Sequence, residues 1–172
     1  MNRKKKIVRN IIILIALSTL FLNRGISLTP MAAHEASERS IHYGPSKVVH
    51  IEDFDDGKYI LCKYDKWISC NTVKKTMFFF WTFGNQVTGI EIDKGRPLNF
   101  TWGYSSDRNK LYGIINDSNI NKVELYLDDG RTLSQTEFYD DDMFLFTWKG
   151  ESKLSEIKAY DSQGNILFKD YK

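Results

Sequence analysis

Short apolar runs separated by turn residues recur from Lys47 to the end of the chain, and they predict a domain built of β-strands. Val, Ile, Thr, Tyr and Phe dominate these runs, and these residue types favour strands. The expected strands are 48–51, 59–64, 67–73, 76–83, 87–92, 98–104, 111–115, 122–126, 143–148 and 156–160. Asp, Gly, Asn and Pro cluster between them, as turns require. The predicted fold class is therefore all-β, with antiparallel strands joined by tight turns.

The second half of this region repeats a hairpin pattern at an offset of 34 residues. A strand at 122–126 is followed by Gly130 and Leu133, and a strand at 156–160 is followed by Gly164 and Leu167. Alternation predicts that Val123, Leu125, Ile157 and Ala159 face inward. Two repeats are fewer than a solenoid needs. A β-sandwich-like unit is therefore expected.

The first residues of the chain carry a different pattern. Arg3, Lys4, Lys5, Lys6 and Arg9 form a basic head, and 11–22 then contains no charge. This order is typical of a membrane-targeting segment whose basic end stays in the cytoplasm. The apolar stretch of about 12 residues is short for a spanning helix, which needs about 17 to 25. An uncleaved anchor and a cleaved signal both stay open, and both place the rest of the chain outside the membrane.

The pattern divides the chain into four parts. They are a signal anchor or signal peptide at 1–27, a juxtamembrane spacer at 28–46, an N-terminal β-meander at 47–104 and the sandwich-like unit at 105–172. Within the spacer, Thr29 followed by Pro30 predicts the start of a short helix. Its apolar face is poor, so the helix is expected to be exposed.

Charge narrows the class of partner. Six of the 24 Lys and Arg residues lie in 1–27, which leaves 18 against 22 acidic residues outside it, a net of −4. Nucleic-acid binding needs a basic face. An acidic outer domain therefore argues against nucleic acid as a partner.

The chain also resembles a family of small, uncharacterised, membrane-associated extracytoplasmic proteins of Gram-positive bacteria. The likeness covers 47–172 loosely and rests on "VVHIEDFDDGKYILCKY", on an aromatic run ending in Gly, and on "LYGIINDSNINKVEL" and "IKAYDSQGNIL". The family carries no established activity. The resemblance therefore implies a location and a fold class, and nothing about chemistry.

Candidate chemistry is sparse. His34 and His42 are expected in a solvated spacer, whereas His50 with Glu52 or Asp53 is the candidate general base of a cell-envelope hydrolase. The acidic groups at 53–56 and 140–142 are interpreted as turn residues rather than calcium ligands, because neither has the twelve-residue loop pattern. No phosphate loop, Gly-x-Ser-x-Gly elbow or Cys-x-x-Cys pair occurs. An enzyme is therefore the less favoured reading, and no metal or cofactor is predicted.

The aromatic residues have two interpretations. Trp67, Trp102, Tyr104 and Trp148 are candidates for a sugar-stacking platform, but a small all-β core also needs large rings, and this reading is favoured. The run 78–83 places five aromatics in six positions, so one of its faces is either covered or exposed as a contact patch. The candidate contact aromatics are Trp67, Phe79, Trp81 and Trp102.

The chain has two cysteines, Cys62 and Cys70. In a hairpin centred on Lys66 they are opposed, and outside the membrane they meet an oxidising compartment, so a disulfide is predicted. A two-residue turn at Asp65-Lys66 opposes Cys62 to Ser69 instead and favours two buried thiols.

The function expected from these patterns is that of an extracytoplasmic β-domain, attached to the membrane by its N-terminal segment. It acts as a binding or interaction module at the cell surface, toward an envelope protein or a polysaccharide. The hydrolase with His50 is the alternative.

Overall fold

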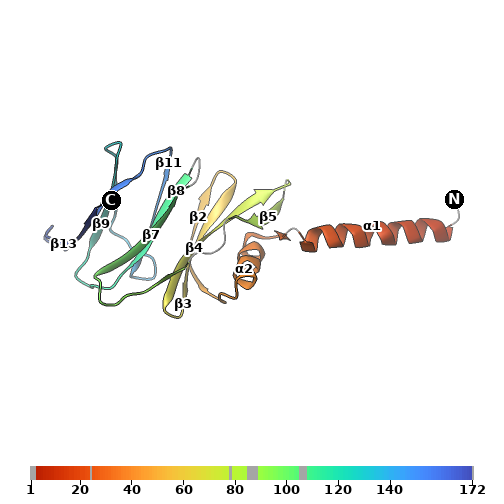
Figure 1. Ribbon diagram of the computed structural model, residues 1–172, viewed down its shortest axis with the longest axis horizontal. Coiled ribbons are helices and arrows are strands. Elements are labelled where there is room, and N and C mark those ends of the chain that lie inside the picture. The colour runs from red at the N-terminus through yellow and green to blue at the C-terminus, as the bar shows by residue number, and fades with distance from the viewer. Residues whose placement is uncertain (1–2, 24, 78, 85–88, 105–107, 172) are drawn as a thin grey trace. The chain divides into compact units, whose positions relative to one another are not determined.

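The computed structural model describes residues 3–23, 25–77, 79–84, 89–104 and 108–171, with the side chains of 20–23 left out (Figure 1). The strands form antiparallel sheets, so the all-β prediction is confirmed. The elements are α1 (Arg3–Asn23), β1 (Ile26–Ser27), α2 (Pro30–Ser40), β2 (Lys47–Phe54), β3 (Gly57–Tyr64), β4 (Trp67–Thr76), β5 (Phe80–Phe83), β6 (Ile90–Glu91), β7 (Leu98–Tyr104), β8 (Arg108–Ile115), β9 (Lys122–Leu127), β10 (Thr132–Gln135), β11 (Met143–Lys149), β12 (Leu154–Tyr160) and β13 (Ile166–Tyr171).

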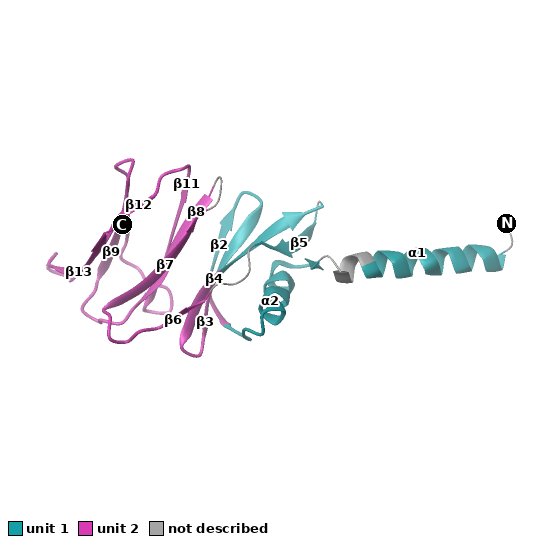
Figure 2. Ribbon diagram, in the orientation of Figure 1, with its two compact units in different colours: residues 1–46, 51–60, 71–87 teal, residues 47–50, 61–70, 88–172 magenta. Residues whose placement is uncertain are grey.

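Two compact units make up the chain (Figure 2). Unit 1 comprises 1–46, 51–60 and 71–87, and unit 2 comprises 47–50, 61–70 and 88–172. The boundary runs through the strands β2, β3 and β4, whereas the sequence division places its boundary in the polar stretch after Tyr104.

Unit 2 contains the sandwich. A four-stranded sheet in the order β10-β9-β12-β13 and a three-stranded sheet in the order β11-β8-β7 share one apolar core. Fully buried core side chains come from both sheets, among them Leu98, Leu111, Leu125, Phe144 and Ile157. The strand β7, which the sequence groups with the meander, pairs with β8 along its whole length. It therefore belongs to the sandwich.

The repeated hairpins lie side by side, because β9 pairs with β12 in an antiparallel register that opposes Val123 to Ala159 and Leu125 to Ile157. All four side chains are fully buried, so their predicted inward orientation is confirmed. The turns form where the repeat places them, at Gly130 (φ 85°) and Gly164 (φ 87°). Both glycines occupy the left-handed region that side chains disfavour, which explains why each turn carries one.

The remaining strands form a six-stranded sheet in the order β1-β5-β4-β3-β2, with β6 pairing to β4. Here the prediction of a single strand at 76–83 is wrong. The strand β4 ends at Thr76, β5 begins at Phe80, and these two residues are paired across a three-residue turn. Met77 enters this turn with a φ of 45°. Because the turn contains no Gly, Pro, Asn or Asp, the usual sequence signal for it is missing.

The helix α2 begins as predicted, with Pro30 in its first turn and Thr29 Oγ1 accepting a hydrogen bond from Ala32 N at 3.1 Å. The expectation that this helix is exposed is wrong. Ala33, His34, Ser37 and Glu38 are buried. A face of small and polar residues is buried here, so the hydropathy pattern carries no sign of it.

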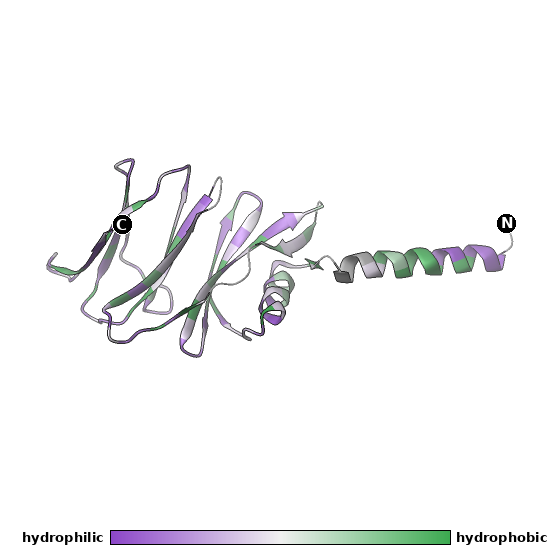
Figure 3. Ribbon diagram, in the orientation of Figure 1, coloured by the Kyte–Doolittle hydropathy of each residue, from purple (hydrophilic) through white to green (hydrophobic). Residues whose placement is uncertain are grey.

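The basic head and the apolar stretch lie together on α1, which Figure 3 shows hydrophilic at its start and hydrophobic further along. Ile12, Leu14 and Ile15 are more than half exposed. Within the described residues, no helix combines the length and the apolar character that crossing a membrane requires. The structure therefore does not support the predicted anchor helix.

Candidate functional site

Two exposed apolar side chains of the β-domain lie at the turn between β4 and β5. Met77 and Phe79 are 61% and 64% exposed, far above the value for any core side chain. Phe79 N donates to Met77 O at 2.9 Å, and the Phe79 and Phe80 rings pack with centroids 4.2 Å apart. The hairpin tip, defined here as Met77 and Phe79, therefore presents apolar side chains to the surroundings on a turn closed by backbone hydrogen bonding.

A buried tryptophan lies on β5, the second residue after the turn. Trp81 of β5 is 8% exposed and opposes Lys75 of β4. The ammonium groups of Lys75 and Lys58 lie 5.5 Å and 6.0 Å from the centroid of its ring, a cation–π arrangement. Lys58 also pairs with Asp53. The positive charge of Lys75 therefore lies on β4, two residues before Met77 of the tip.

A second segment brings another apolar side chain next to β5. The short strand β1 pairs with β5, with Ser27 opposite Trp81. The next residue, Leu28, is 71% exposed. Continuing the antiparallel register by one step brings it to the level of Phe80, the first residue after the turn. Leu28 therefore extends the apolar surface of the tip.

The predicted contact aromatics are divided between the two units. Phe79 and Trp81 belong to unit 1, whereas Trp67 and Trp102 belong to unit 2. Phe79 is exposed, Trp81 is buried, and Trp67 and Trp102 are half-buried, the latter packed against the sandwich core. Phe78 lies outside the described residues. Of the four, Phe79 has the exposure that a contact residue needs.

The favoured core reading is confirmed for Trp148. It is 5% exposed and belongs to the core, and its Nε1 donates to Ser152 O at 2.8 Å. Tyr104 packs edge-on against its ring and its hydroxyl accepts from Leu154 N at 3.1 Å. These contacts tie the two rings to the end of the sandwich.

Sequence reasoning missed a buried polar cluster on α2. His34 and Glu38 are 1% and 4% exposed and lie one helical turn apart, with Nε2 3.2 Å from Oε1. Ser46 Oγ donates to the same Glu38 oxygen, and its backbone N donates to the other at 3.3 Å. Asn71 Nδ2 lies 3.1 Å from His34 Nδ1. The His–Glu spacing of four residues was the available signal, but the partners are distant in sequence.

These contacts specify one tautomer of His34. An amide nitrogen donates, so Nδ1 accepts from Asn71 and the proton lies on Nε2, which donates to Glu38. Burial lowers the pKa of His34 and outweighs the opposing effect of Glu38 and Glu35. A neutral imidazole that joins the helix to the Ser46 segment is a structural link. In a catalytic triad, the carboxylate binds the ring nitrogen that lies away from the serine. Here Glu38 and Ser46 both lie at Nε2, so the arrangement differs from a triad.

The lowered pKa predicts a loss of stability in acid. In the unfolded chain His34 has an ordinary pKa near 6.5, whereas in the folded protein its pKa is lower. Below pH 6.5 the unfolded chain therefore binds more protons than the folded protein, and the free energy of unfolding falls. Urea unfolding at pH 7.5 and 5.5 measures this. In His34→Gln the fall between the two pH values is expected to shrink, while exposed His42→Gln keeps it. An unchanged pH dependence in His34→Gln contradicts the assignment.

The histidine of the hydrolase alternative lies elsewhere. The His50 ring stacks on Tyr139, with centroids 3.7 Å apart and an interplanar angle of 11°. Asp53, one of its predicted acidic partners, pairs with Lys58 in unit 1. Aromatic stacking on Tyr139 is thus one contact of His50.

The acidic run before β11 is balanced by lysines. Lys47 Nζ lies 2.8 Å from Asp140 Oδ1, and Lys63 Nζ lies 3.1 Å from Asp140 Oδ2 and 2.5 Å from Asp142 Oδ1. Hydrogen bonds from these lysines lower the pKa of Asp140. Among the described residues, no group of three or more His, Cys, Asp or Glu is arranged to hold a metal ion. The ion pairs fit the structural reading of this run.

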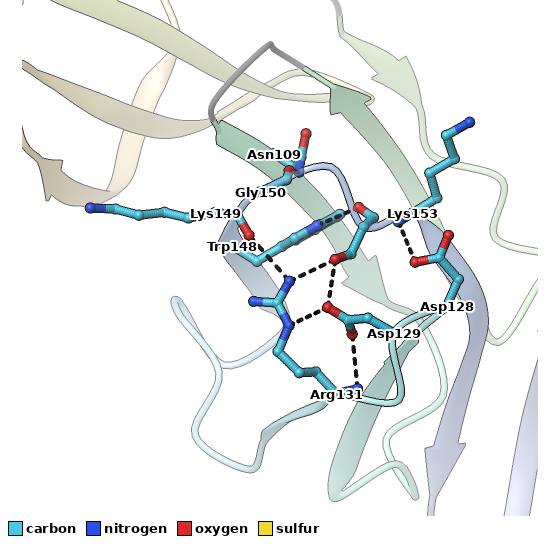
Figure 4. A network of polar contacts seen from close by, with 9 residues as sticks. Asn109, Asp128, Asp129, Arg131, Trp148, Lys149, Gly150 and Lys153 are labelled. Carbon is cyan, nitrogen blue, oxygen red and sulfur yellow. Dashed lines mark hydrogen bonds and ion pairs between the residues drawn. The ribbon is translucent and has the colours of Figure 1, made fainter.

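Another polar network closes one end of the sandwich (Figure 4). Asp129 in the β9–β10 turn accepts from Arg131 Nε at 2.7 Å and from Ser152 Oγ at 2.5 Å, and the Ser152 bond contributes most to lowering the Asp129 pKa to about 2. Arg131 also donates to Lys149 O at 3.1 Å. Asp128 accepts from Lys153 N at 3.0 Å. The network joins the β9–β10 turn to the β11–β12 connection, so its evident role is to fix two loops.

The cysteines are buried thiols in the structure. The strand β3 ends at Tyr64 and β4 begins at Trp67, which leaves a two-residue turn. At the far end of this hairpin, Lys75 N donates a hydrogen bond to Asp56 O. Both features oppose Cys62 to Ser69, which places Cys62 and Cys70 on opposite faces. The turn thus favours the thiol alternative. The disulfide stays a prediction, which alkylation of the denatured, unreduced protein decides.

Comparison with known protein families, curated proteins and solved structures finds no match to this chain.

Proposed function

We propose that this protein is an extracytoplasmic, membrane-associated β-domain that acts as an interaction module at the cell surface, with the hairpin tip as its contact surface. The observation that carries this proposal is the exposure of Met77 and Phe79 on a turn backed by lysines. Exposed apolar side chains that gather in one place, rather than singly, mark contact sites. The resemblance to extracytoplasmic proteins of Gram-positive bacteria agrees with the proposed location.

The N-terminal segment supports the location. Its basic residues precede an uncharged apolar stretch on the same helix, the order that a translocation machinery recognises as inside-to-outside. The apolar side chains of α1, among them Ile12 and Leu14, are exposed in the isolated chain. Such a surface is stable in a lipid or translocon environment and costly in water. As an anchor or as a cleaved signal, this segment delivers the β-domain to the outer side.

A topology experiment tests the location. Protease added to intact protoplasts of a Gram-positive host is expected to digest a C-terminal tag placed after Lys172, because the β-domain lies outside. A cytoplasmic reporter in the same cells is expected to survive until the protoplasts are lysed. Replacing the basic head by Lys4→Glu, Lys5→Glu and Lys6→Glu is expected to reduce the digested fraction. A tag that is protected in intact protoplasts and digested after lysis rules the proposal out.

A further inference from the structure

The chemistry of the hairpin tip identifies the surface that it contacts. We propose that Met77 and Phe79 insert into the interface of an anionic lipid bilayer, while Lys74 and Lys75 bind headgroup phosphates. This inference rests on the proposed function only in requiring that the domain work beside a membrane. It adds a second attachment, independent of the N-terminal segment, and names its partner as lipid.

The placement of the lysines fits a phosphate layer around an inserted turn. Lys74 and Lys75 oppose Thr82 and Trp81 across the hairpin, and Thr76 separates Lys75 from the turn. Adjacent residues of a strand point to opposite faces, so one lysine lies on each side of the hairpin. Lys75 is exposed and Lys74 is half-buried. Apolar side chains at the end of a hairpin, with cations two and three residues before them, reproduce the order of acyl chains and anionic headgroups in a leaflet.

The tip has the wrong form for the other candidate partners. A stable protein interface buries about 800 Å² on each side, more than the described exposed side chains of this surface, Met77, Phe79 and Leu28, can offer. A sugar-binding platform needs a broad ring with a polar handle, whereas Met and Phe have no hydrogen-bonding group at their ends. A lipid surface demands neither, because insertion depends on apolar side chains and on nearby positive charge.

Weak insertion is sufficient for a tethered domain. A few apolar side chains with two lysines give reversible membrane binding, and stable attachment takes a second signal. The N-terminal segment supplies that signal while it remains uncleaved, and it raises the effective concentration of the tip at the bilayer. The tip therefore orients the domain on the membrane and is not required to hold it there alone.

Site-directed fluorescence on the full chain tests insertion. Met77→Cys is labelled with a bimane dye in vesicles of phosphatidylglycerol and phosphatidylcholine, where the buried Cys62 and Cys70 are expected to stay unlabelled in the unaltered chain. Nitroxide lipids carrying the spin label near the top of the acyl chain are expected to quench the dye at position 77 at least threefold. A dye at Ser162→Cys, in the exposed β12–β13 turn, is expected to be quenched less than 1.2-fold.

Variants separate the apolar contribution from the electrostatic one. Phe79→Ser is expected to reduce the quenching at position 77 at least twofold, and Lys74→Gln with Lys75→Gln is expected to reduce it as much in anionic vesicles. Lys94→Gln with Lys153→Gln, a charge-matched pair in unit 2, is expected to leave it unchanged. Circular dichroism verifies that each variant folds. Raising the salt concentration is expected to weaken the quenching, because it screens the lysine–phosphate attraction.

Each remaining outcome overturns the inference. Equal quenching at positions 77 and 162, or none at 77 while the chain stays on the vesicles, shows that the tip does not insert. A blue shift of the dye with wall polysaccharide or with a second copy of the chain, but not with vesicles, assigns the tip to that partner. The vesicle experiment tests insertion of the tip and does not depend on which side of a cell membrane the domain occupies. Its result is therefore independent of the protoplast experiment, which tests location.

Discussion

Phe144→Ala is expected to lower the free energy of unfolding by about 3–5 kcal/mol, the usual cost of deleting a fully buried phenyl ring. Phe144 has no exposed surface and is among the largest fully buried side chains of the chain. It lies in the core that both sheets of unit 2 share, with its ring centroid 5.9 Å from that of Phe146. Its removal leaves a cavity in this core. The strands β11, β8 and β7 are held together by pairing and cannot readily close it.

Urea unfolding followed by tryptophan fluorescence measures this loss. Phe79→Ala is the matched control, since it removes the same ring from a position that is 64% exposed, and its effect is expected to stay within about 0.5 kcal/mol. A loss below about 1 kcal/mol for Phe144→Ala contradicts the assignment of this ring to the centre of the core.

The sandwich was predictable because its sequence obeys two simple rules. Inward residues alternate with outward ones in β9 and β12, and glycines mark the turns at Gly130 and Gly164, where the backbone enters the left-handed region. The 34-residue offset then relates one hairpin to the other. Period and turn chemistry therefore specified this unit without any long-range information.

The β4–β5 hairpin was not predictable by the same rules. Its turn consists of apolar residues, and Met77 adopts a positive φ that such side chains disfavour. Local preference favours continuing the strand, and the pairing of Thr76 with Phe80 overrides that preference. Phe79 was chosen as a candidate contact residue from its position in the aromatic run, and the turn shows why it is exposed.

The buried face of α2 escaped prediction for a different reason. Its buried residues are small or polar, so no apolar stripe announces it. His34 is stabilised there by Glu38 and by Asn71, which lies 37 positions further along the chain. A polar group can be buried when such partners satisfy it, and the partners are visible only in the folded chain.

Gly113→Ala is the second substitution with a large expected effect. A Cβ atom at Gly113 would lie 2.3 Å from Asn99 O on one neighbouring strand and 2.4 Å from Phe144 Cζ on the other. Real Cβ contacts are never so short, so either the strand or the ring must move. Overpacking of this kind lowers the free energy of unfolding by about 1–3 kcal/mol. Because one of the clashes is with a backbone atom, Gly113→Ala is expected to lower it by about 3 kcal/mol.

The adjacent strand offers the control for this test. Gly103 lies in β7, opposite Lys110, and a Cβ atom there would have Lys110 Cε at 3.9 Å as its nearest neighbour. Gly103→Ala is therefore expected to leave the free energy of unfolding unchanged or slightly raised, since alanine loses less chain entropy on folding. Equal effects at Gly113 and Gly103 would show that the close approach at Gly113 is not real.

A double variant separates the two clashes at Gly113. Phe144 opposes Gly113 in the β8–β11 register, so its ring covers the space that a side chain at Gly113 would need. Shortening the ring in Phe144→Leu relieves one contact but leaves the Asn99 carbonyl in place. The cost of Gly113→Ala with Phe144→Leu is therefore expected to be smaller than the sum of the single costs, by about 1 kcal/mol, without returning to the wild-type value. Strict additivity would mean that the ring and the glycine do not share this space.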